Sequence, residues 1–490
     1  MDNYIEINSD YLSRPVSNLH YEKVRNLLNK ESKLLTIVVQ GYSRIDKLCN
    51  CVESVLKFID DKTDLILLDN GSEEDEVMDF YKKIDFEHKK IIRVTKNITG
   101  VYSINKVLHK IETRYILWVN SDVYLTKNVI ENLVACAESD DSIGMVVPAS
   151  TNISNLQIET LGGFNNLEEM QKKAELFNIS DPTKWEEKIR LIPTATLYRR
   201  EIFDTVGLYD LGFMHDFGDD DYTFRVRRAG YKLMLCRDTF VHHDHDQTAL
   251  PQERLDIMAN SREFFKEKHH GIDAWGDTSN YIDFTLNEVK VTDLSDKKIM
   301  AIDVKCGTPI LNIKNFLRKR SVRVNKCKAY TTEGKYYIDL QSISDEVCCG
   351  DVERMVLSES DKYDFVVIGK PINCYDDPFA FIRNIISCMN ENAVLIFAVR
   401  NTSDVRAFCD TLNISISGSS LHPQTIKYQE FLEILEKNDF CSAEINTTTH
   451  SISDDLKGSL IELLSSMGQK VGNQMLNNMM IEDYWITAKR

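Results

Sequence analysis

The sequence predicts two α/β domains in series, each built on a doubly wound, mostly parallel sheet. Short apolar runs alternate with segments whose apolar residues follow helical spacing, which is the pattern of parallel βαβ units. The alternation lapses at residues 273–298, a polar stretch with five aspartates, and then resumes. A chain of 490 residues is also too long for a single hydrophobic core, so two domains are expected.

Composition narrows the classes of function. The chain is 43% hydrophobic and 28% charged, as soluble globular proteins are, and no apolar run reaches the length of about 20 residues that a membrane span needs. Its first ten residues are polar and acidic, unlike a secretory signal. The twelve cysteines lie mostly in apolar runs without a CxxC pair, which indicates reduced, buried thiols. Because a net charge of −17 opposes binding to a phosphate backbone, we expect a cytoplasmic protein that does not bind nucleic acid.

The first domain is expected over residues 33–275, after a helical extension at residues 1–32 that carries a short amphipathic pattern. Short apolar runs predict strands of this domain at residues 34–39, 65–68, 91–94 and 115–119. A polar, helical stretch at residues 151–188 interrupts the alternation. We interpret it as an insertion over the sheet, which forms either an acceptor-side wall or a purely structural flap.

A linker is expected at residues 276–295, followed by the second α/β domain at residues 296–490. Asp377-Pro378 marks the start of a helix in this domain, because proline is favoured in the first turn. Strands of the second domain are predicted at residues 299–304, 365–368, 393–399 and 484–488.

Three polar clusters of the first domain stand at predicted strand or loop edges. Asn120-Ser121-Asp122 follows an apolar run, residues 219–221 are three aspartates, and residues 241–245 read Val-His-His-Asp-His. Taken singly, the first is more often a turn, the second a solvated loop that caps a helix beginning near Tyr222, and the third an ordinary surface. Their order in an α/β pattern favours a shared crevice, where they form a candidate metal and general-base group.

Over residues 33–270 the chain resembles the inverting GT-A glycosyltransferases of family 2. Three segments carry the resemblance in the family's order, namely TIVVQGYSR (36–44), LILLDNGS (65–72) and NITGVYSIN (97–105). The resemblance implies that Tyr42 lies against the base and that Asp69 contacts the base or ribose. Gln40 and Ser43 depart from the family's usual Pro and Asn. The nucleotide-sugar-binding residues that it implies are Gln40, Tyr42, Arg44, Asp69, Asn97, Asn105 and Ser121.

The same resemblance implies a metal site. Asn120-Ser121-Asp122 is similar to a DxD-type motif whose first acid is replaced by Asn, so Asp122 is the expected metal ligand. His243 or His242 is similar to the late histidine that completes the site, and His243 is our choice. Oxygen ligands favour magnesium or manganese, and a histidine ligand favours manganese of the two.

The resemblance also implies the catalytic residues. The segment FGDDDYTFR (217–225) looks like the family's ED-type catalytic motif. Counting back from Arg225 places the general base at Asp219 and a supporting carboxylate at Asp221. Asp220 stays open as an alternative base.

Together these residues predict an inverting, metal-dependent glycosyltransferase of hexosyltransferase type. The expected donor is a nucleotide-diphosphate sugar, with a UDP-sugar such as UDP-GlcNAc favoured and a dTDP-sugar as an alternative. The expected acceptor is a hydroxyl of a glycan, a glycolipid precursor or a protein such as a flagellar or surface component. Nucleotidyl transfer is less favoured, because it needs a Gly-rich basic loop that residues 41–44 do not provide. A glycan-binding assembly scaffold with decayed domains is the non-enzyme alternative.

The second domain looks like a class I S-adenosylmethionine-dependent methyltransferase domain with a degenerate cofactor motif. In the segment AIDVKCGTP (301–309) only the central glycine of the family's loop remains, and residues 322–325 lack the acid that normally holds the ribose. The resemblance leaves Asp303, Gly307 and Asp351 as remnants of a cofactor site. We therefore favour a domain used for acceptor docking or homodimerisation, with a bifunctional glycosyltransferase and sugar O-methyltransferase as the alternative.

Overall fold

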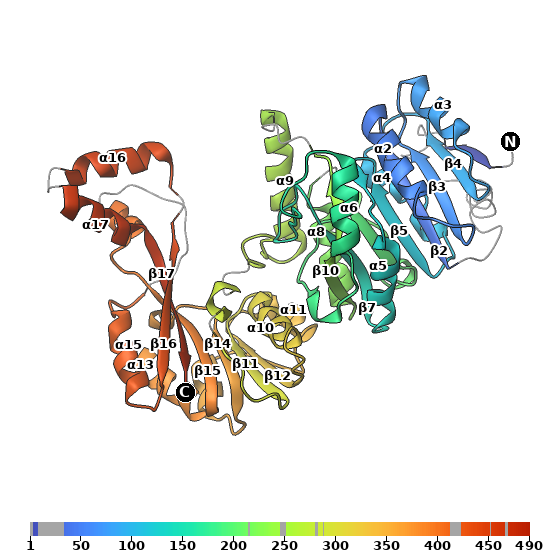
Figure 1. The fold of residues 1–490 in the computed structure, drawn as a ribbon. Helices are drawn as coiled ribbons and strands as arrows, with labels where there is room; N and C mark the ends of the chain where they lie inside the picture. The colour runs from blue at the N-terminus through green and yellow to red at the C-terminus, as the bar shows by residue number, and fades with distance from the viewer. Residues whose placement is uncertain are drawn as a thin grey trace. The chain divides into compact units, whose positions relative to one another are not determined.

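The computed structural model describes residues 3–7, 34–213, 216–245, 251–279, 283–287, 289–411, 423–450, 452–465 and 469–490. It divides into two compact units, residues 1–278 and 279–490, and the division falls inside the predicted linker. Both units are α/β and mostly parallel, which confirms the predicted fold class (Figure 1).

The first unit is built on one large sheet. Its strands are β1 (Tyr4–Ile7), β2 (Leu35–Gly41), β3 (Thr63–Asp69), β4 (Lys89–Val94), β5 (Tyr115–Asn120), β6 (Val123–Tyr124), β7 (Ile143–Ser150), β8 (Trp185–Glu187), β9 (Ala195–Arg199) and β10 (Lys232–His243). The strand order is β1-β4-β3-β2-β5-β9-β7-β10-β6, and β8 pairs with β10. Strands β1 to β5 of this path are parallel, whereas β9 is antiparallel to both of its neighbours. The carboxyl ends of β2 and β5 therefore lie side by side.

Helices cover both faces of this sheet. They are α2 (Ile45–Leu56), α3 (Asp75–Lys83), α4 (Gly100–Ile104), α5 (Val129–Glu138), α6 (Leu167–Phe177), α7 (Ile202–Thr205), α8 (Gly218–Arg228) and α9 (Gln252–Lys268), with short 3-10 turns η2 (Leu108–Lys110) and η3 (Pro182–Lys184). Ile37 and Val39 pack with α2, α3 and α5 on one face, while Val38 packs with α4, α7 and α8 on the other. Because both faces are buried, β2 is apolar along nearly its whole length, which is why the sequence predicted it.

The N-terminal extension differs from its prediction where the structure describes it. Residues Tyr4–Ile7 form a strand that pairs in parallel with β4, and they are not helical. Isoleucine at positions 5 and 7 favours an extended strand, because β-branched side chains fit a pleated surface. The amphipathic pattern at residues 19–28 lies outside the described residues.

The polar insertion at residues 151–188 packs on the sheet, as predicted. Met170 and Ala174 of α6 contact Phe240 of β10, and β8 adds an antiparallel strand to β10. The Asn166 side chain caps α6 by accepting a hydrogen bond from the Glu169 N–H at 2.9 Å. The insertion is followed closely by Arg190, Ile192 and Pro193, which line the cleft described below.

The second unit contains seven strands. They are β11 (Lys297–Ile302), β12 (Val324–Thr331), β13 (Glu346–Cys349), β14 (Tyr363–Ile368), β15 (Met389–Arg400), β16 (Ser442–Thr449) and β17 (Ile481–Lys489). Their order is β13-β12-β11-β14-β15-β17-β16, parallel except for β17, which is antiparallel to both β15 and β16. The strand predicted at residues 484–488 is therefore present. Its antiparallel direction could not be predicted from the pattern of apolar residues.

The second unit also contains helices, and three of those that follow β15 pack together in an apolar cluster of their own. The helices are α10 (Thr308–Arg318), α11 (Tyr337–Gln341), α12 (Val352–Leu357), α13 (Pro378–Ser387), α14 (Val405–Thr411), α15 (Tyr428–Glu436), α16 (Asp454–Ser465) and α17 (Gln469–Met480), with 3-10 turns η4 (Asp283–Leu286), η5 (Gly334–Tyr336) and η6 (Ile372–Cys374). The helix predicted from Asp377-Pro378 is confirmed: α13 begins there, and Asp377 accepts a hydrogen bond from the Ala380 N–H at 2.9 Å.

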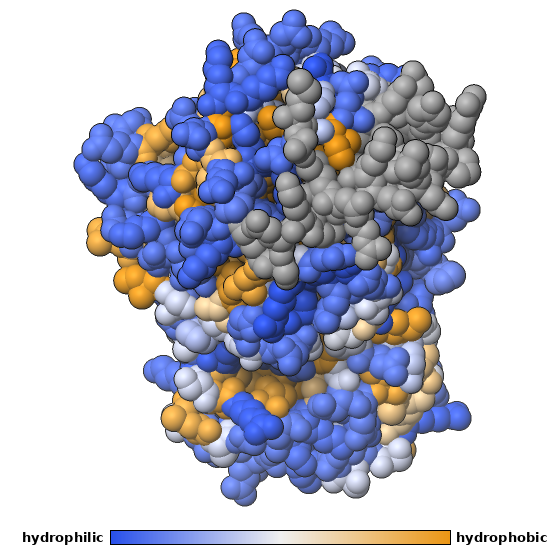
Figure 2. Space-filling model, turned by 90° about the vertical axis from the view of Figure 1, so that its right-hand side faces the viewer, coloured by the Kyte–Doolittle hydropathy of each residue, from blue (hydrophilic) through white to orange (hydrophobic). Residues whose placement is uncertain are grey.

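The surface agrees with the composition. Hydrophilic residues cover most of the face drawn in Figure 2. Across the described ranges, no helix is long and apolar enough to span a membrane. All twelve cysteines are free, and only Cys349 and Cys441 are exposed.

Candidate active site

A cleft of about 740 Å³ opens at the carboxyl ends of the parallel strands in the first unit. Gln40 comes from the end of β2, Asn120 from the end of β5, Gly100 from the start of α4, and Asp219 from the first turn of α8. Parallel strands whose helices cover opposite faces open a crevice at this edge, as the sequence predicted. The lining is completed by Val101, Trp118, Ser154, Asn155, Arg190, Ile192, Pro193, Tyr209, Asp216, Phe217, Asp220 and Trp275.

The three consecutive aspartates belong to a helix and not to a solvated loop. Helix α8 begins at Gly218, whereas the solvated-loop interpretation had the helix beginning near Tyr222. The residue before the helix, Phe217, has a φ of 65°. A left-handed non-glycine residue is uncommon and is concentrated at functional sites. The aspartates therefore occupy the first helical turn, where the unpaired N–H groups stabilise negative charge.

Asp219 and Asp220 both line the cleft but have different partners. Arg190 Nη1 lies 2.9 Å from Asp220 Oδ1, and the Trp275 indole N–H donates to Asp220 Oδ2 at 3.2 Å. Within the described part of the chain, no side chain donates a hydrogen bond to the Asp219 carboxylate. Asp219 is therefore the carboxylate that is open to a substrate hydroxyl.

Burial, together with the neighbouring charge of Asp220, raises the pKa of Asp219. Burial also raises the pKa of Asp220, against the opposing effect of the Arg190 guanidinium. A raised pKa makes a carboxylate a stronger proton acceptor when it is ionised, which suits a general base.

Asp221 does not line the cleft. It is completely buried and ion-paired with Arg225 Nε at 2.9 Å and Lys268 Nζ at 2.7 Å, and His269 Nε2 lies 2.9 Å from its Oδ1. Burial opposes ionisation of Asp221, but the His269 hydrogen bond and the two cations lower its pKa to about 2. This arrangement supports an anchoring role between α8 and α9, while the predicted catalytic support stays a prediction.

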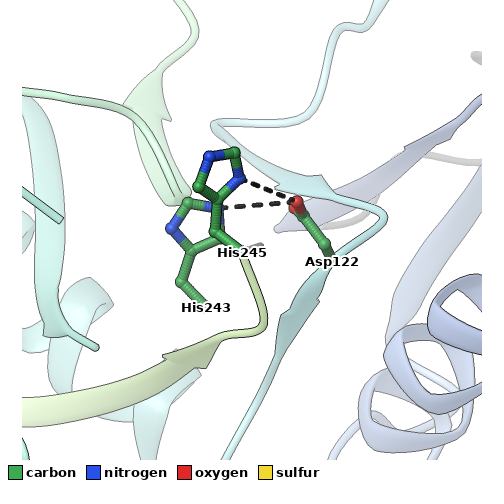
Figure 3. A group of neighbouring side chains, drawn as sticks. All are labelled: Asp122, His243 and His245. Carbon is green, nitrogen blue, oxygen red and sulfur yellow. Dashed lines mark ion pairs between the residues drawn. The ribbon is translucent and has the colours of Figure 1, made fainter. Parts of the chain in front are cut away.

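The structure brings Asp122 and His243 together (Figure 3). Strand β6 pairs with the end of β10 so that Val123 lies opposite His243, and the Asp244 N–H donates to the Asp122 carbonyl at 2.8 Å. His243 Nε2 then lies 3.5 Å from Asp122 Oδ2, and His245 Nδ1 lies 4.0 Å from the same oxygen. The side chains of His243 and His245 follow the period of two that places alternate residues on one side of an extended chain.

This group has a donor set that fits a divalent cation. One carboxylate oxygen and two imidazole nitrogens lie within 4.8 Å of one another. Burial opposes ionisation of Asp122, yet the hydrogen bond and charge of His243 lower its pKa. An ionised oxygen with two nitrogens suits manganese or another transition metal better than magnesium, which prefers oxygen ligands alone.

His242, the alternative ligand, points elsewhere. Its ring makes edge contacts with Tyr124 and Phe164, and burial lowers its pKa. Thr151 Oγ1 lies 2.8 Å from its Nδ1 and also accepts a hydrogen bond from the His243 N–H at 2.9 Å, which fixes this end of β10. His245 was not in the predicted ligand set, although strand alternation from His243 could have indicated it.

Three predicted nucleotide-binding residues lie at or just after the end of β2. Tyr42, just after β2, has 41% of its surface exposed, so its ring is open for a nucleotide base. Gln40 lines the cleft and donates hydrogen bonds to the Gly100 carbonyl at 2.7 Å and to Ser103, which hold the start of α4 against β2. Proline, the residue that the family usually has at this position, could not donate these hydrogen bonds through its side chain. Arg44 precedes α2 with a left-handed φ of 51°, so it belongs to the turn between β2 and α2.

The other predicted nucleotide-binding residues do not line the cleft. Asp69 is fully buried, accepts hydrogen bonds from the Ser72 N–H at 3.0 Å and hydroxyl at 2.6 Å, and pairs with Arg93 Nε at 3.2 Å. Asn105 is buried and exchanges two hydrogen bonds with the backbone of Tyr209. Asn97, which is exposed, accepts from the Thr99 N–H, and Ser121 is half-buried. Their contact with a nucleotide stays a prediction.

In the second unit, the remnant cofactor residues make internal contacts. The Asp303 carboxylate accepts hydrogen bonds from the Thr332 N–H at 2.6 Å and from the Tyr375 hydroxyl at 2.8 Å. Gly307 has a φ of 96°, and a Cβ there would lie 2.3 Å from the Ile343 side chain. Asp351 caps α12. These residues therefore stabilise loops and, as they stand, do not fit a cofactor that would need the Asp303 oxygens.

Comparisons with known proteins relate part of the first unit to glycosyltransferases. Residues 36–207 match the model of the family described as glycosyl transferase family 2. The curated glycosyltransferase GlyG of Streptococcus pneumoniae serotype 4 is 24% identical over 231 residues, which cover 46% of this chain and 75% of GlyG.

Solved structures are similar to the chain only distantly. GalNAc-T7 with UDP, GalNAc and Mn²⁺ matches with a TM-score of 0.39 and 14% identity, over 64% of this chain and 57% of that one. A SAM-dependent methyltransferase of Archaeoglobus fulgidus matches with a TM-score of 0.31 and 14% identity, over 46% of this chain and 99% of that one. The mannosyltransferase PcManGT of Pyrobaculum calidifontis, with GDP-Man and Mn²⁺, matches with a TM-score of 0.35 and 12% identity, over 62% and 79% of the two chains.

The family match runs from β2 to the residues just after β9 and includes the whole Asn120-Ser121-Asp122 motif. The relative in Streptococcus pneumoniae is described as a glycosyltransferase. Within the N-terminal unit, residues 36–207 are therefore similar to glycosyl transferase family 2.

Proposed function

We propose that this protein is an inverting, metal-dependent glycosyltransferase that moves a sugar from a nucleotide diphosphate to an acceptor hydroxyl. The observation that carries the proposal is Asp219, a carboxylate that lines a cleft at the carboxyl ends of β2 and β5 and has no side-chain donor among the described residues. Asp122 follows two residues after Asn120 of the same cleft and is part of a donor group with His243 and His245.

The roles of the residues follow from their surroundings. Asp219 accepts the proton of the acceptor hydroxyl as the oxygen attacks the anomeric carbon, and in-line attack inverts that centre. Asp122, His243 and His245 would hold the divalent cation, which supplies neutralising charge to the leaving diphosphate. The exposed ring of Tyr42 would bind the base of the donor. The sugar of the donor would then bind in the cleft.

The donor and acceptor classes extend this proposal. A UDP-sugar such as UDP-GlcNAc is the favoured donor, with a dTDP-sugar as the alternative, and a glycan, glycolipid precursor or surface protein is the acceptor. The second unit is proposed as a docking or dimerisation domain, because the Asp303 oxygens are engaged by Thr332 and Tyr375. Tight binding of S-adenosylmethionine in calorimetry would instead favour the bifunctional enzyme.

The test is a panel of nucleotide sugars incubated with the full chain and Mn²⁺, scored by release of nucleoside diphosphate. We expect release from one donor class and stereochemical inversion in the product. Binding of glycans without turnover of any donor would favour the assembly scaffold and contradict the proposal.

A further inference from the structure

Asp220 is the anchored member of the two adjacent carboxylates in the cleft. Arg190 engages one of its oxygens at 2.9 Å and Trp275 engages the other at 3.2 Å. The side chains of this ion pair are nearly buried, with 13% of Arg190 and 4% of Asp220 exposed. A pair in such surroundings interacts more strongly than a pair in open water, and losing one partner leaves a buried charge unpaired.

Trp275 is itself held in one orientation. Its ring stacks on Phe217 with centroids 4.7 Å apart and planes at 21°, and the Arg262 guanidinium lies 5.3 Å from the indole centroid. Arg262 in turn pairs with Asp273 at 2.8 Å. The indole N–H is therefore fixed toward Asp220. Asp220 and Trp275 both lie beyond the segment that the family model matches, which ends at residue 207.

We propose that Arg190 and Trp275 are positioning residues that select the catalytic base, because they hold Asp220 as a bonded carboxylate and leave Asp219 to take the acceptor's proton. The proposal rests on the transferase function proposed above. It adds two residues, from segments far apart in the sequence, that act through Asp220 and need not touch the substrate.

The charges around the two carboxylates make Arg190 the decisive group. Asp216 is paired with Arg254 at 2.8 Å, and Asp273 is paired with Arg262, so these acids carry their own cations. Arg190 lowers the pKa of both Asp219 and Asp220 against the effect of burial. Among the described residues, the titratable and charged groups that face the pair from the surrounding elements are Arg190, Tyr198, Tyr209, Asp216 and Asp273.

The direction of the pH effect follows from these charges. A general base works only when it is ionised, so activity falls as the pH drops through its pKa. Without the Arg190 charge, both carboxylates hold protons more tightly and the acid limb of the pH profile moves to higher pH. A neighbouring arginine lowers a carboxyl pKa by about 1–3 units, so a shift of about one unit or more is expected.

The first experiment measures kcat/KM for nucleotide release against pH in the full-length protein. Arg190→Met should move the acid limb up by about one pH unit or more, whereas Arg190→Lys, which keeps a cation, should leave it within about half a unit. Binding of UDP, measured by calorimetry, should change less than about threefold in both variants. An unshifted acid limb in Arg190→Met would show that Arg190 does not act through the carboxylates.

The second experiment needs no turnover, so it separates this proposal from the proposed function. The chain has four tryptophans, and the emission lost in Trp275→Phe isolates the signal of Trp275. Titrating that signal from pH 8 to 4 follows protonation of Asp220, and Arg190→Met should raise its midpoint by about one unit or more. A midpoint equal to that of the wild type overturns the proposal even if the enzyme is active. A raised midpoint supports the network even if no tested donor is turned over.

Discussion

Asp219 and Asp220 are the same residue type in consecutive positions, yet their surroundings give them different chemistry. Burial raises the pKa of both, but Asp220 is bonded by side chains through both oxygens, while Asp219 lines the cleft without a side-chain donor among the described residues. Environment and not residue type separates an anchored carboxylate from a base, as in other sites with two carboxylates.

Replacing the base should therefore slow transfer without weakening donor binding. Asp219→Asn is nearly isosteric but cannot accept a proton, so we expect kcat to fall by about 100-fold or more. Asp220→Asn, the matched control, should be milder because the open carboxylate remains. Single-turnover rates with an acceptor, beside the Kd of the nucleoside diphosphate, provide the measurement. A dead Asp220 variant with an active Asp219 variant would move the base by one residue.

The metal group makes a second prediction at this scale. Chelation or Asp122→Ala should abolish transfer, and His245→Ala should raise the Mn²⁺ concentration for half-maximal rate by about tenfold or more. His242→Ala should leave the metal requirement unchanged, because its ring contacts Tyr124 and Phe164. Full activity of Asp122→Ala in excess chelator would remove the metal from the mechanism.

At the scale of elements, the sequence could predict strands whose two faces are both buried. Strands β2, β3 and β5 are continuous apolar runs for that reason, and their carboxyl ends could be linked to the polar motifs that follow them. The direction of β9 and β17, and the strand at Tyr4–Ile7, depend on pairing with distant segments, which local patterning does not show.

The same limit applies to the site. Asp122, His243 and Asp219 could be predicted because they follow strands or open a helix in recognisable motifs. Arg190 and Trp275 could not, since only the tertiary fold brings them to Asp220. The contacts of the buried Asp69 carboxylate with Ser72 and Arg93 also could not be predicted from the sequence.

The loop before α10 gives a prediction about stability. Gly307→Ala places a Cβ 2.3 Å from Ile343 at a φ of 96°, so we expect a loss of about 2 kcal/mol or more from the unfolding free energy of the second unit. Gly458→Ala in α16, where nothing lies within 4 Å of the added Cβ, should be neutral or stabilise by up to about 1 kcal/mol. Urea denaturation followed by circular dichroism compares them, and equal effects would contradict the strained-loop account.

At the scale of the whole molecule, the chemistry and the division into units coincide. Every residue proposed to bind the donor, hold the metal or accept the proton lies before residue 278, where the first unit ends. The fold of the second unit could be predicted from its strand and helix pattern. Its use could not, because the residues that resemble a cofactor site are engaged in loop contacts that only the structure shows.

A fragment that ends near Asp277 should therefore still release nucleoside diphosphate from the donor in water, because the cleft and the metal group are complete within it. Transfer to the natural acceptor should fall if the second unit docks that acceptor or holds a dimer together. Circular dichroism and thermal melting establish that the fragment is folded, and donor hydrolysis is then compared with that of the full chain. A folded fragment without donor hydrolysis would mean that residues after 278 complete the first site.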